Sequence, residues 1–264
     1  MVDFQCKRRY DWEDFLRIMR LLRSPGGCPW DAEQTHQSIR RNFLEETYEA
    51  LDALDRDDPL DMCEELGDVL MQVVFHATIE EERGRFTMAD VVDGVAQKMV
   101  YRHPHVFGTV HVDNSDQVLV NWEKLKRTEK GQASTADAIE AVPHTLPALW
   151  RAEKVQKKAA KAGFDWPDVS GAMDKLREET DELAGAIAGR GDPAEELGDL
   201  LFAAVNIARF LEVDPEAALH AASDKFARRF RLVEQTAARR GQDLNTLSLD
   251  ELNALWDEAK QAKA

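Results

Sequence analysis

Apolar residues recur with helical spacing in both halves of the chain. In each of three segments they occupy positions i, i+3, i+4 and i+7, which places them on one face of a helix. Alternation of apolar and polar residues, typical of half-buried strands, is not sustained anywhere. The pattern therefore predicts an all-α protein. The three sets are Phe15, Ile18, Met19 and Leu22; Leu66, Val69, Leu70 and Val73; and Leu197, Leu200, Leu201 and Ala204.

Two helix starts are marked by an Asp-Pro pair. Asp58-Pro59 and Asp192-Pro193 each offer an N-cap carboxylate followed by a proline at the first helical position. Glu195, three residues after Asp192, is placed to close a capping box. The helices before these starts are expected to end near Asp55 and at residues 189–191. Each half then contains two consecutive helices joined by a short turn, which favours antiparallel neighbours.

The chain contains an internal repeat. Five blocks recur in the same order, which indicates a duplication. We predict two tandem helical-bundle domains, residues 1–127 and 148–264, joined by a Gly- and Pro-containing linker at 128–147. The paired blocks are 27–31 with 163–167, 44–49 with 177–182, 64–68 with 195–199, Lys98 and Arg102 with Lys225 and Arg229, and Trp122 with Trp256.

Carboxylates gather on the two predicted helices of each half. EExxE and ExxD spacing places several acids on one helix face, next to the apolar stripe. Carboxylates that converge near a core either take up protons or bind a cation, and hard oxygen ligands suit Mg²⁺ or Mn²⁺. The sequence predicts such a site in each half. The candidate ligands are Glu178, Glu179, Glu182, Glu196 and Asp199 in the second half, and Glu45, Glu46, Glu49, Glu65 and Asp68 in the first.

Two other interpretations of these acids are possible. Runs of charge are usually solvated helix faces, but a solvated face does not explain why the same spacing occurs twice. A di-iron carboxylate bundle needs two Glu-x-x-His motifs, and Glu33 to His36 has no counterpart in the other half. Glu195 can act simply as part of a helix cap.

Basic and aromatic residues follow the carboxylates in each half. Lys225 and Arg229, with Arg228, are spaced to share a helix face, and Lys98 and Arg102 repeat this spacing. Such side chains can bind a triphosphate. A surface ion-pair network would also explain one such pair, but its recurrence after the carboxylates of both halves favours the triphosphate. Trp256 and Trp122 can stack on a base, or they can pack the last helix of each half onto its bundle.

Net charge narrows the range of partners. The 264 residues carry a formal charge of −16, which disfavours binding to nucleic acid polymers and to anionic membranes. No apolar run is long enough to span a membrane and the N-terminus has no secretory pattern, so we expect a cytoplasmic protein. Three widely spaced cysteines predict neither a disulfide framework nor a thiolate zinc site. P-loop, GxGxxG and nucleophile-elbow motifs are absent.

Together these motifs resemble the MazG family of all-α nucleoside triphosphate pyrophosphatases, in its tandem two-domain form. The resemblance covers nearly the whole chain. It rests on the paired EExxE and ExxD motifs and on the segments SPGGCPWD at 24–31, RHPHVFG at 102–108 and AGFDW at 162–166. It implies Mg²⁺-dependent hydrolysis of nucleoside triphosphates to monophosphate and pyrophosphate, with broad base tolerance, by a homodimer.

The resemblance also implies roles for individual residues. From the carboxylate cluster and the basic helix themselves, we expect Glu178, Lys225 and Arg229 to be the catalytic groups, with Glu178 orienting or deprotonating the attacking water. The first half forms a second candidate site from its five acids, Lys98, Arg102 and Trp122. A nucleotide-sensing or adaptor module without turnover is the alternative function. The expected metal ligands are Glu179, Glu182, Glu196 and Asp199, and the expected nucleotide contacts are Lys175, Glu178, Glu179, Asp192, Glu195, Asp199, Lys225, Arg228, Arg229 and Trp256.

Overall fold

A computed structural model describes residues 4–129 and 134–261. The chain divides into two compact units, Met1–Leu125 and Lys126–Ala264. The described residues form α-helices and one short 3₁₀ turn, with no strand among them, so the predicted all-α class is confirmed. Within this described part of the chain, no helix is both long and apolar enough to cross a membrane.

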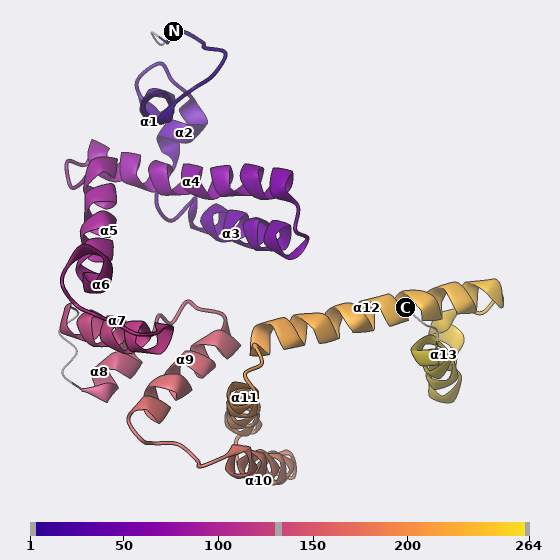
Figure 1. The fold of residues 1–264 in the computed structure, drawn as a ribbon. Coiled ribbons are helices and arrows are strands. Elements are labelled where there is room, and N and C mark those ends of the chain that lie inside the picture. Colours follow the sequence, from indigo (N-terminus) through magenta and orange to yellow (C-terminus); the bar gives the residue numbers. More distant parts are fainter. Residues whose placement is uncertain (1–3, 130–133, 262–264) are drawn as a thin grey trace. The chain divides into compact units, whose positions relative to one another are not determined.

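Unit 1 is built around a pair of helices that lie side by side (Figure 1). These are α3 (Arg40–Asp55) and α4 (Pro59–Glu82). Shorter helices lead into this pair and continue from it. They are α1 (Trp12–Arg23), α2 (Pro29–Glu33), α5 (Met88–Arg102), α6 (Pro104–Phe107) and α7 (Ser115–Glu129), the last of which crosses the division between the units.

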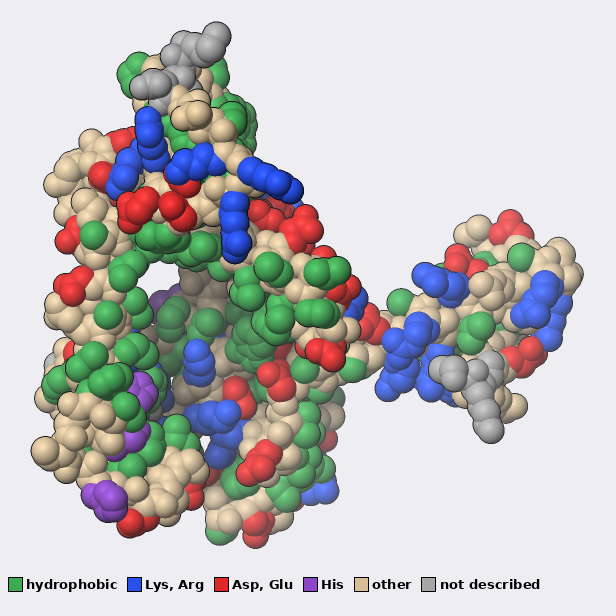
Figure 2. All heavy atoms as spheres, turned by 45° about the horizontal axis from the view of Figure 1, so that its top comes forward, with side chains coloured by type: hydrophobic (Ala, Val, Ile, Leu, Met, Phe, Trp, Pro, Cys, Tyr) green, Lys and Arg blue, Asp and Glu red, His purple; other side chains and the backbone are tan. Residues whose placement is uncertain are grey.

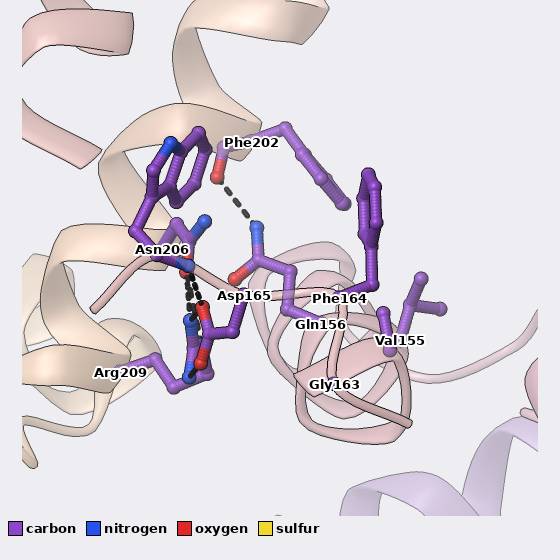
Figure 3. Close-up of a pocket in the computed structure, with 10 residues that line it drawn as sticks. Val155, Gln156, Gly163, Phe164, Asp165, Phe202, Asn206 and Arg209 are labelled. Atoms are coloured by element: carbon purple, nitrogen blue, oxygen red, sulfur yellow. Dashed lines mark hydrogen bonds and ion pairs between the residues drawn. The ribbon is translucent and has the colours of Figure 1, made fainter. Parts of the chain in front are cut away.

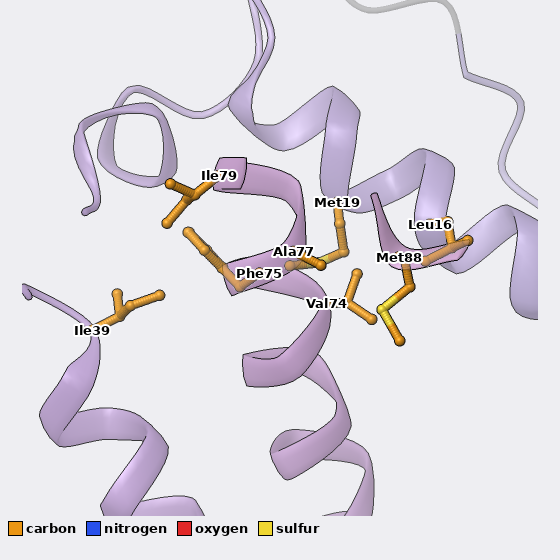
Figure 4. Packing of buried hydrophobic residues seen from close by; sticks show 8 residues of the cluster. All are labelled: Leu16, Met19, Ile39, Val74, Phe75, Ala77, Ile79 and Met88. Carbon is orange, nitrogen blue, oxygen red and sulfur yellow. The ribbon is translucent and has the colours of Figure 1, made fainter. Parts of the chain in front are cut away.

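The core of unit 1 lies where α1 packs against the C-terminal half of α4. Leu16 and Met19 of α1 contact this half of α4, and Met88 at the start of α5 joins them (Figure 4). Leu16 and Met19 belong to the helical set predicted from the sequence. The buried cluster comprises Leu16, Met19, Ile39, Val74, Phe75, Ala77, Ile79 and Met88.

Unit 2 repeats the helical pair. Helices α10 (Val169–Ile187) and α11 (Pro193–Phe210) pack on each other, and α9 (Ala148–Lys161) packs on α11. The remaining elements are α8 (Thr135–Glu140), α12 (Pro215–Arg239), η1 (Leu244–Thr246) and α13 (Leu249–Gln261). The segment 128–147, predicted to be a linker, contains the helix α8.

Both helical pairs are joined by tight, capped turns. The Asp58 carboxylate accepts hydrogen bonds from the N–H groups of Leu60 and Asp61, and the Asp192 carboxylate accepts one from Ala194. The predicted helix starts at residues 59 and 193 are therefore confirmed. The predicted capping box is wrong: the Asp192 carboxylate accepts from Ala194 and not from Glu195, and the described contacts include no return bond from the Glu195 side chain to the N–H of Asp192.

Candidate metal and nucleotide sites

The α10–α11 pair brings three carboxylates together. One oxygen each from Glu179, Glu196 and Asp199 lies within 4.8 Å of the others. Glu179 comes from the middle of α10, while Glu196 and Asp199 share a face in the first two turns of α11. Glu179 is buried, Glu196 is half-buried and Asp199 is exposed, so the cluster opens from the core toward solvent.

Glu179 is only partly neutralised within the protein. Its Oε1 lies 2.6 Å from the Lys175 ammonium, which also lies 2.7 Å from Glu178 Oε1. The two carboxylates raise the pKa of Lys175, which therefore stays charged. The second oxygen, Oε2, is buried and has no hydrogen-bond partner among the described residues. An unpaired buried carboxylate oxygen is costly, and a divalent cation held between these three acids would satisfy it.

Glu182 lies beside this cluster. Burial raises its pKa most, and the negative charge of Glu179 raises it further. Lys175 lowers this pKa, and Glu178 and Glu196 add smaller increases. Repulsion among ionised acids in one place is relieved by a bound cation. The donor set, which consists of carboxylate oxygens alone, suits a hard ion such as Mg²⁺ or Mn²⁺.

Unit 1 contains a second cluster of the same kind. Oxygens of Glu46, Glu49 and Glu65 lie within 4.8 Å of one another, and Glu65 Oε2 is buried without a partner among the residues described. Burial raises the pKa of Glu46 and of Glu65, and neighbouring acids that include Asp68 raise both further. Both halves thus present a convergent carboxylate group.

The two clusters differ in their internal cation. Lys175 precedes the EExxE motif of the second half by three residues, and Asn42 occupies that place in the first half. The exposed Glu45 instead pairs with Arg41 at 2.8 Å, outside the cluster. The first cluster therefore lacks the counterpart of the ammonium that contacts Glu179.

The basic residues Lys225, Arg228 and Arg229 lie on α12, outside the helical pair that carries the carboxylates. Helix α12 contacts α9 and α11 and then extends beyond them (Figure 1). Lys and Arg side chains gather along the α12–α13 segment (Figure 2). Among the described residues, no hydrogen bond or ion pair joins Lys225, Arg228 or Arg229 to an acid of α10 or α11. The roles of Lys225, Arg228 and Arg229 at this site stay a prediction.

The late tryptophans pack inside their units. The ring of Trp256 lies 5.0 Å from that of Phe226 and packs against the α12–α13 core, which is the structural role that the sequence also allowed. In unit 1 the buried Arg102 guanidinium lies 5.3 Å from the centroid of the Trp122 ring. Lys98 is half-buried on α5. Asp192 caps α11, and Glu195 is exposed in its first turn.

One feature of unit 2 was not anticipated from the sequence. A cavity of about 460 Å³ lies between α9, the loop that follows it and α11 (Figure 3). The AGFDW segment supplies part of its wall. Asn206 is a polar residue among the apolar residues of α11, and this is the sequence signal that could have revealed the cavity. The lining residues are Val155, Gln156, Ala159, Gly163, Phe164, Asp165, Trp166, Phe202, Asn206 and Arg209.

Comparison with known proteins agrees with the duplicated architecture. The MazG nucleotide pyrophosphohydrolase domain matches this chain twice, over residues 34–107 and 169–233. Both matches contain an EExxE and an ExxD motif, and therefore both carboxylate clusters.

Similar proteins extend the match over most of the chain. The nucleoside triphosphate pyrophosphohydrolase of Escherichia coli (strain K12) is 45% identical over 251 residues, which cover 93% of this chain and 95% of that protein. The nucleoside triphosphate pyrophosphohydrolase/pyrophosphatase MazG of Thermotoga maritima is 44% identical over 249 residues, covering 94% and 95%. The uncharacterized protein YabN of Bacillus subtilis is 48% identical over 259 residues, covering 96% of this chain and 52% of YabN. The chain belongs to the MazG nucleotide pyrophosphohydrolase family.

Proposed function

We propose that this protein hydrolyses nucleoside triphosphates to nucleoside monophosphate and pyrophosphate, with Mg²⁺ as cofactor and broad tolerance of the base. The observation that carries the proposal is the α10–α11 cluster, in which Glu179 lies close to two further carboxylates and its buried Oε2 has no hydrogen-bond partner among the described residues. The names of the Escherichia coli and Thermotoga maritima relatives support the same reaction. Mn²⁺ is a chemically equivalent substitute.

Each acid has a separate role in this proposal. Glu179, Glu182, Glu196 and Asp199 would hold Mg²⁺, which when bound neutralises charge on the phosphates and on the leaving pyrophosphate. Glu178 would orient or deprotonate the attacking water. The Lys175 ammonium lies 2.7 Å from Glu178 Oε1. A carboxylate accepts at both of its oxygens, so Glu178 Oε2 would take the proton. Lys175 would contact a phosphate when a cation replaces it beside Glu179.

The cationic side chains would come from a homodimer. Leu219, Phe226 and Phe230 are exposed on α12 and are spaced seven and four residues apart, so they form an apolar stripe. We propose that this stripe packs against a second copy of the chain, and that the assembly brings Lys225 and Arg229 to the triphosphate. Light scattering coupled to gel filtration tests this: Phe226→Glu with Phe230→Glu is expected to convert a dimer into a monomer. A wild-type monomer would contradict it.

The reaction is tested with paired variants in the full chain. Glu179→Gln with Glu182→Gln disables the second cluster, Glu46→Gln with Glu49→Gln disables the first, and a quadruple variant disables both. With Mg²⁺ and mixed nucleoside triphosphates, we expect pyrophosphate release by the quadruple variant to fall by about 100-fold or more, the size of losing a preorganised electrostatic contact. If only one double variant retains activity, the cluster that this variant leaves intact belongs to the active half.

Asp181→Asn with Glu234→Gln is the matched control, because both side chains are exposed and lie outside the clusters. Unchanged pyrophosphate release by the quadruple variant would refute the site. Nucleotide binding without any product would favour the alternative, a sensing or adaptor module. A cytoplasmic location stays a prediction.

A further inference from the structure

Two histidine rings meet in unit 1, outside the carboxylate cluster of that unit. His36 lies in the segment 34–39 between α2 and α3, and His76 lies on α4. Their Nδ1 atoms are 2.7 Å apart, and the nearly parallel rings have centroids separated by 5.0 Å. Two imidazole nitrogens that face each other in this way form a hydrogen bond or, after a small separation, a pair of metal ligands.

The buried Glu80 fixes the position of the hydrogen on His36. Its Oε1 contacts His36 Nε2 and also accepts hydrogen bonds from Arg83 at 3.1 Å and from Arg85 at 2.5 Å. Because a carboxylate that binds two guanidinium groups is ionised and can only accept, His36 Nε2 carries the hydrogen and His36 Nδ1 carries a lone pair. Metal-binding histidines are usually held in this way, by a carboxylate on the ring nitrogen that does not face the metal.

The distance between the two Nδ1 atoms is close to the distance between two nitrogen ligands on one ion. Zn–N bonds of about 2.1 Å at a tetrahedral angle place the nitrogens about 3.3 Å apart. The two rings therefore have to separate by only about 0.6 Å to admit the ion. In the metal-free pair His76 Nδ1–H donates to His36 Nδ1, and on binding this hydrogen moves to His76 Nε2, so that both Nδ1 lone pairs face the ion.

A buried oxygen without a partner lies one helical turn from His76. Gln72 precedes His76 by four residues and shares its face of α4, at a rise of about 6 Å. The side chain is 5% exposed, and its Oε1 has no hydrogen-bond partner among the described residues. The rings of His36 and His76 are half-buried, which leaves places for water on a bound ion. Such a water would satisfy the Gln72 oxygen.

The duplicated fold does not require these polar groups. When the two ExxD motifs are aligned, Ile207 and Leu211 of unit 2 correspond to His76 and Glu80. Helix α11 nevertheless forms the same helical pair as α4 does. The polar residues of unit 1 therefore indicate a role beyond holding the helical pair together.

We infer that His36 and His76 bind a transition-metal ion, for which Zn²⁺ fits best, and that Glu80 positions His36 for it. Imidazole nitrogen suits Zn²⁺, whereas the carboxylate cluster of unit 1 suits Mg²⁺. The two sites are separate, since His76 follows Asp68 by eight residues, about 12 Å along α4. A Zn²⁺ ion between the histidines joins the segment 34–39 to α4 and thereby fixes the start of α3.

Calorimetric titration of the full-length protein with Zn²⁺ tests this assignment, with Mg²⁺ in excess to fill the carboxylate clusters. We expect a single Zn²⁺ to bind with an affinity that His36→Gln and His76→Ile each abolish. His144→Gln, which changes an exposed histidine of unit 2, is the control and retains the site. Glu80→Gln leaves both ligands in place and weakens binding by about 10- to 100-fold, the size expected for a partner that orients a ligand.

Cu²⁺ identifies the ligand atoms directly. Imidazole nitrogens split the electron paramagnetic resonance spectrum of bound Cu²⁺, and carboxylate oxygens do not. In excess Mg²⁺ we expect splitting by two nitrogens in the wild type and in His144→Gln, and its loss in His76→Ile. The measurement on the wild type does not depend on the folding of any variant.

The outcomes separate the histidine pair from the carboxylates. Zn²⁺ binding that both histidine variants retain, or a wild-type Cu²⁺ spectrum without nitrogen splitting, would overturn the inference and leave the pair as a hydrogen bond. Zn²⁺ binding that is lost only in Glu46→Gln with Glu49→Gln would assign the ion to the carboxylate cluster and overturn it as well. The proposed hydrolysis is tested independently, by pyrophosphate release.

Discussion

A lysine and a divalent cation compete for one carboxylate in the second half. Lys175 Nζ lies 2.6 Å from Glu179 Oε1, and Glu179 is also the most buried of the candidate ligands. Without metal the ammonium partly neutralises the cluster. When a cation binds, the same ammonium becomes a repelling neighbour or moves to the phosphates.

Replacing this lysine is expected to make the protein more dependent on metal. In Lys175→Met the acids of α10 lose their internal cation, so the metal-free melting temperature falls by roughly 3–6 °C, as for a loss of about 1 kcal/mol. Mg²⁺ should then raise the melting temperature more than it does in the wild type. Thermal unfolding with and without Mg²⁺ measures both effects, and Lys154→Met on exposed α9 surface is the control. If Mg²⁺ raises the melting temperature of Lys175→Met and of the wild type equally, Lys175 does not compete with the cation for Glu179.

A pair of histidines in unit 1 is expected to make the stability of the protein depend on pH. The Nδ1 atoms of His36 and His76 lie 2.7 Å apart, and His36 also bonds to the buried Glu80. Burial lowers the pKa of His76, and the neighbouring His36 lowers it further. Because the unfolded chain then takes up a proton more readily than the folded one, the stability due to a neutral His76 is present above about pH 6.5 and is lost as pH falls.

His76→Ile is the matched variant, because Ile207 follows Asp199 by eight residues as His76 follows Asp68. We expect the melting temperature to fall less between about pH 7.5 and pH 5.5 in this variant than in the wild type. Glu80, whose pKa His36 and Arg85 lower, loses its contribution only at more acidic pH, below its unfolded value. If the melting temperatures of the variant and the wild type fall by the same amount across this range, His76 is not the group responsible for the pH dependence.

At the scale of elements, the loop before α10 depends on a glycine. Trp166 packs directly on Gly171, in the first turn of α10: a Cβ built there would lie 2.3 Å from Trp166 Cδ1. Gly171→Ala should therefore displace the indole from the cavity wall and destabilise unit 2 by about 1–3 kcal/mol. Gly198→Ala on α11 is the control, since nothing lies within 4 Å of its Cβ and helix propensity favours alanine by up to ~1 kcal/mol. Denaturant unfolding of the two variants should shift in opposite directions, and a shift in the same direction would contradict this packing.

The elements follow from local rules, whereas the site depends on contacts between them. Asp58-Pro59 and Asp192-Pro193 fix two helix starts because capping needs only neighbouring residues. The ExxD spacing predicts which acids share a face of α11, but not that Glu179 is buried while Asp199 is exposed. The cavity could not be predicted from periodicity, because it depends on how α9 packs against α11 and on the bond between Gln156 and Phe202. The position of α12 relative to the carboxylates is likewise a matter of packing, and its spacing alone does not determine it.

Duplication leaves the whole molecule with two carboxylate clusters of unequal character. The first cluster has Asn42 where the second has Lys175, and the pKa values of Glu46 and Glu65 are raised by burial and by neighbouring acids. A protein of formal charge −16 gains stability wherever a cation relieves such repulsion. Keeping two such clusters is costly unless cations occupy them.

Both clusters are therefore expected to bind a divalent ion in the absence of nucleotide. Calorimetric titration with Mn²⁺ at constant pH should show binding at both clusters in the wild type. Glu46→Gln with Glu49→Gln should remove the first contribution, Glu179→Gln with Glu182→Gln the second, and the quadruple variant both. Because no lysine has to be displaced from the first cluster, we expect it to bind Mn²⁺ more tightly than the second does, and Lys175→Met should narrow that difference. If the titration shows one class of Mn²⁺ site and only the α10 variants abolish it, the acids of the first half do not bind the ion. The contribution of unit 1 to hydrolysis would then have to be structural.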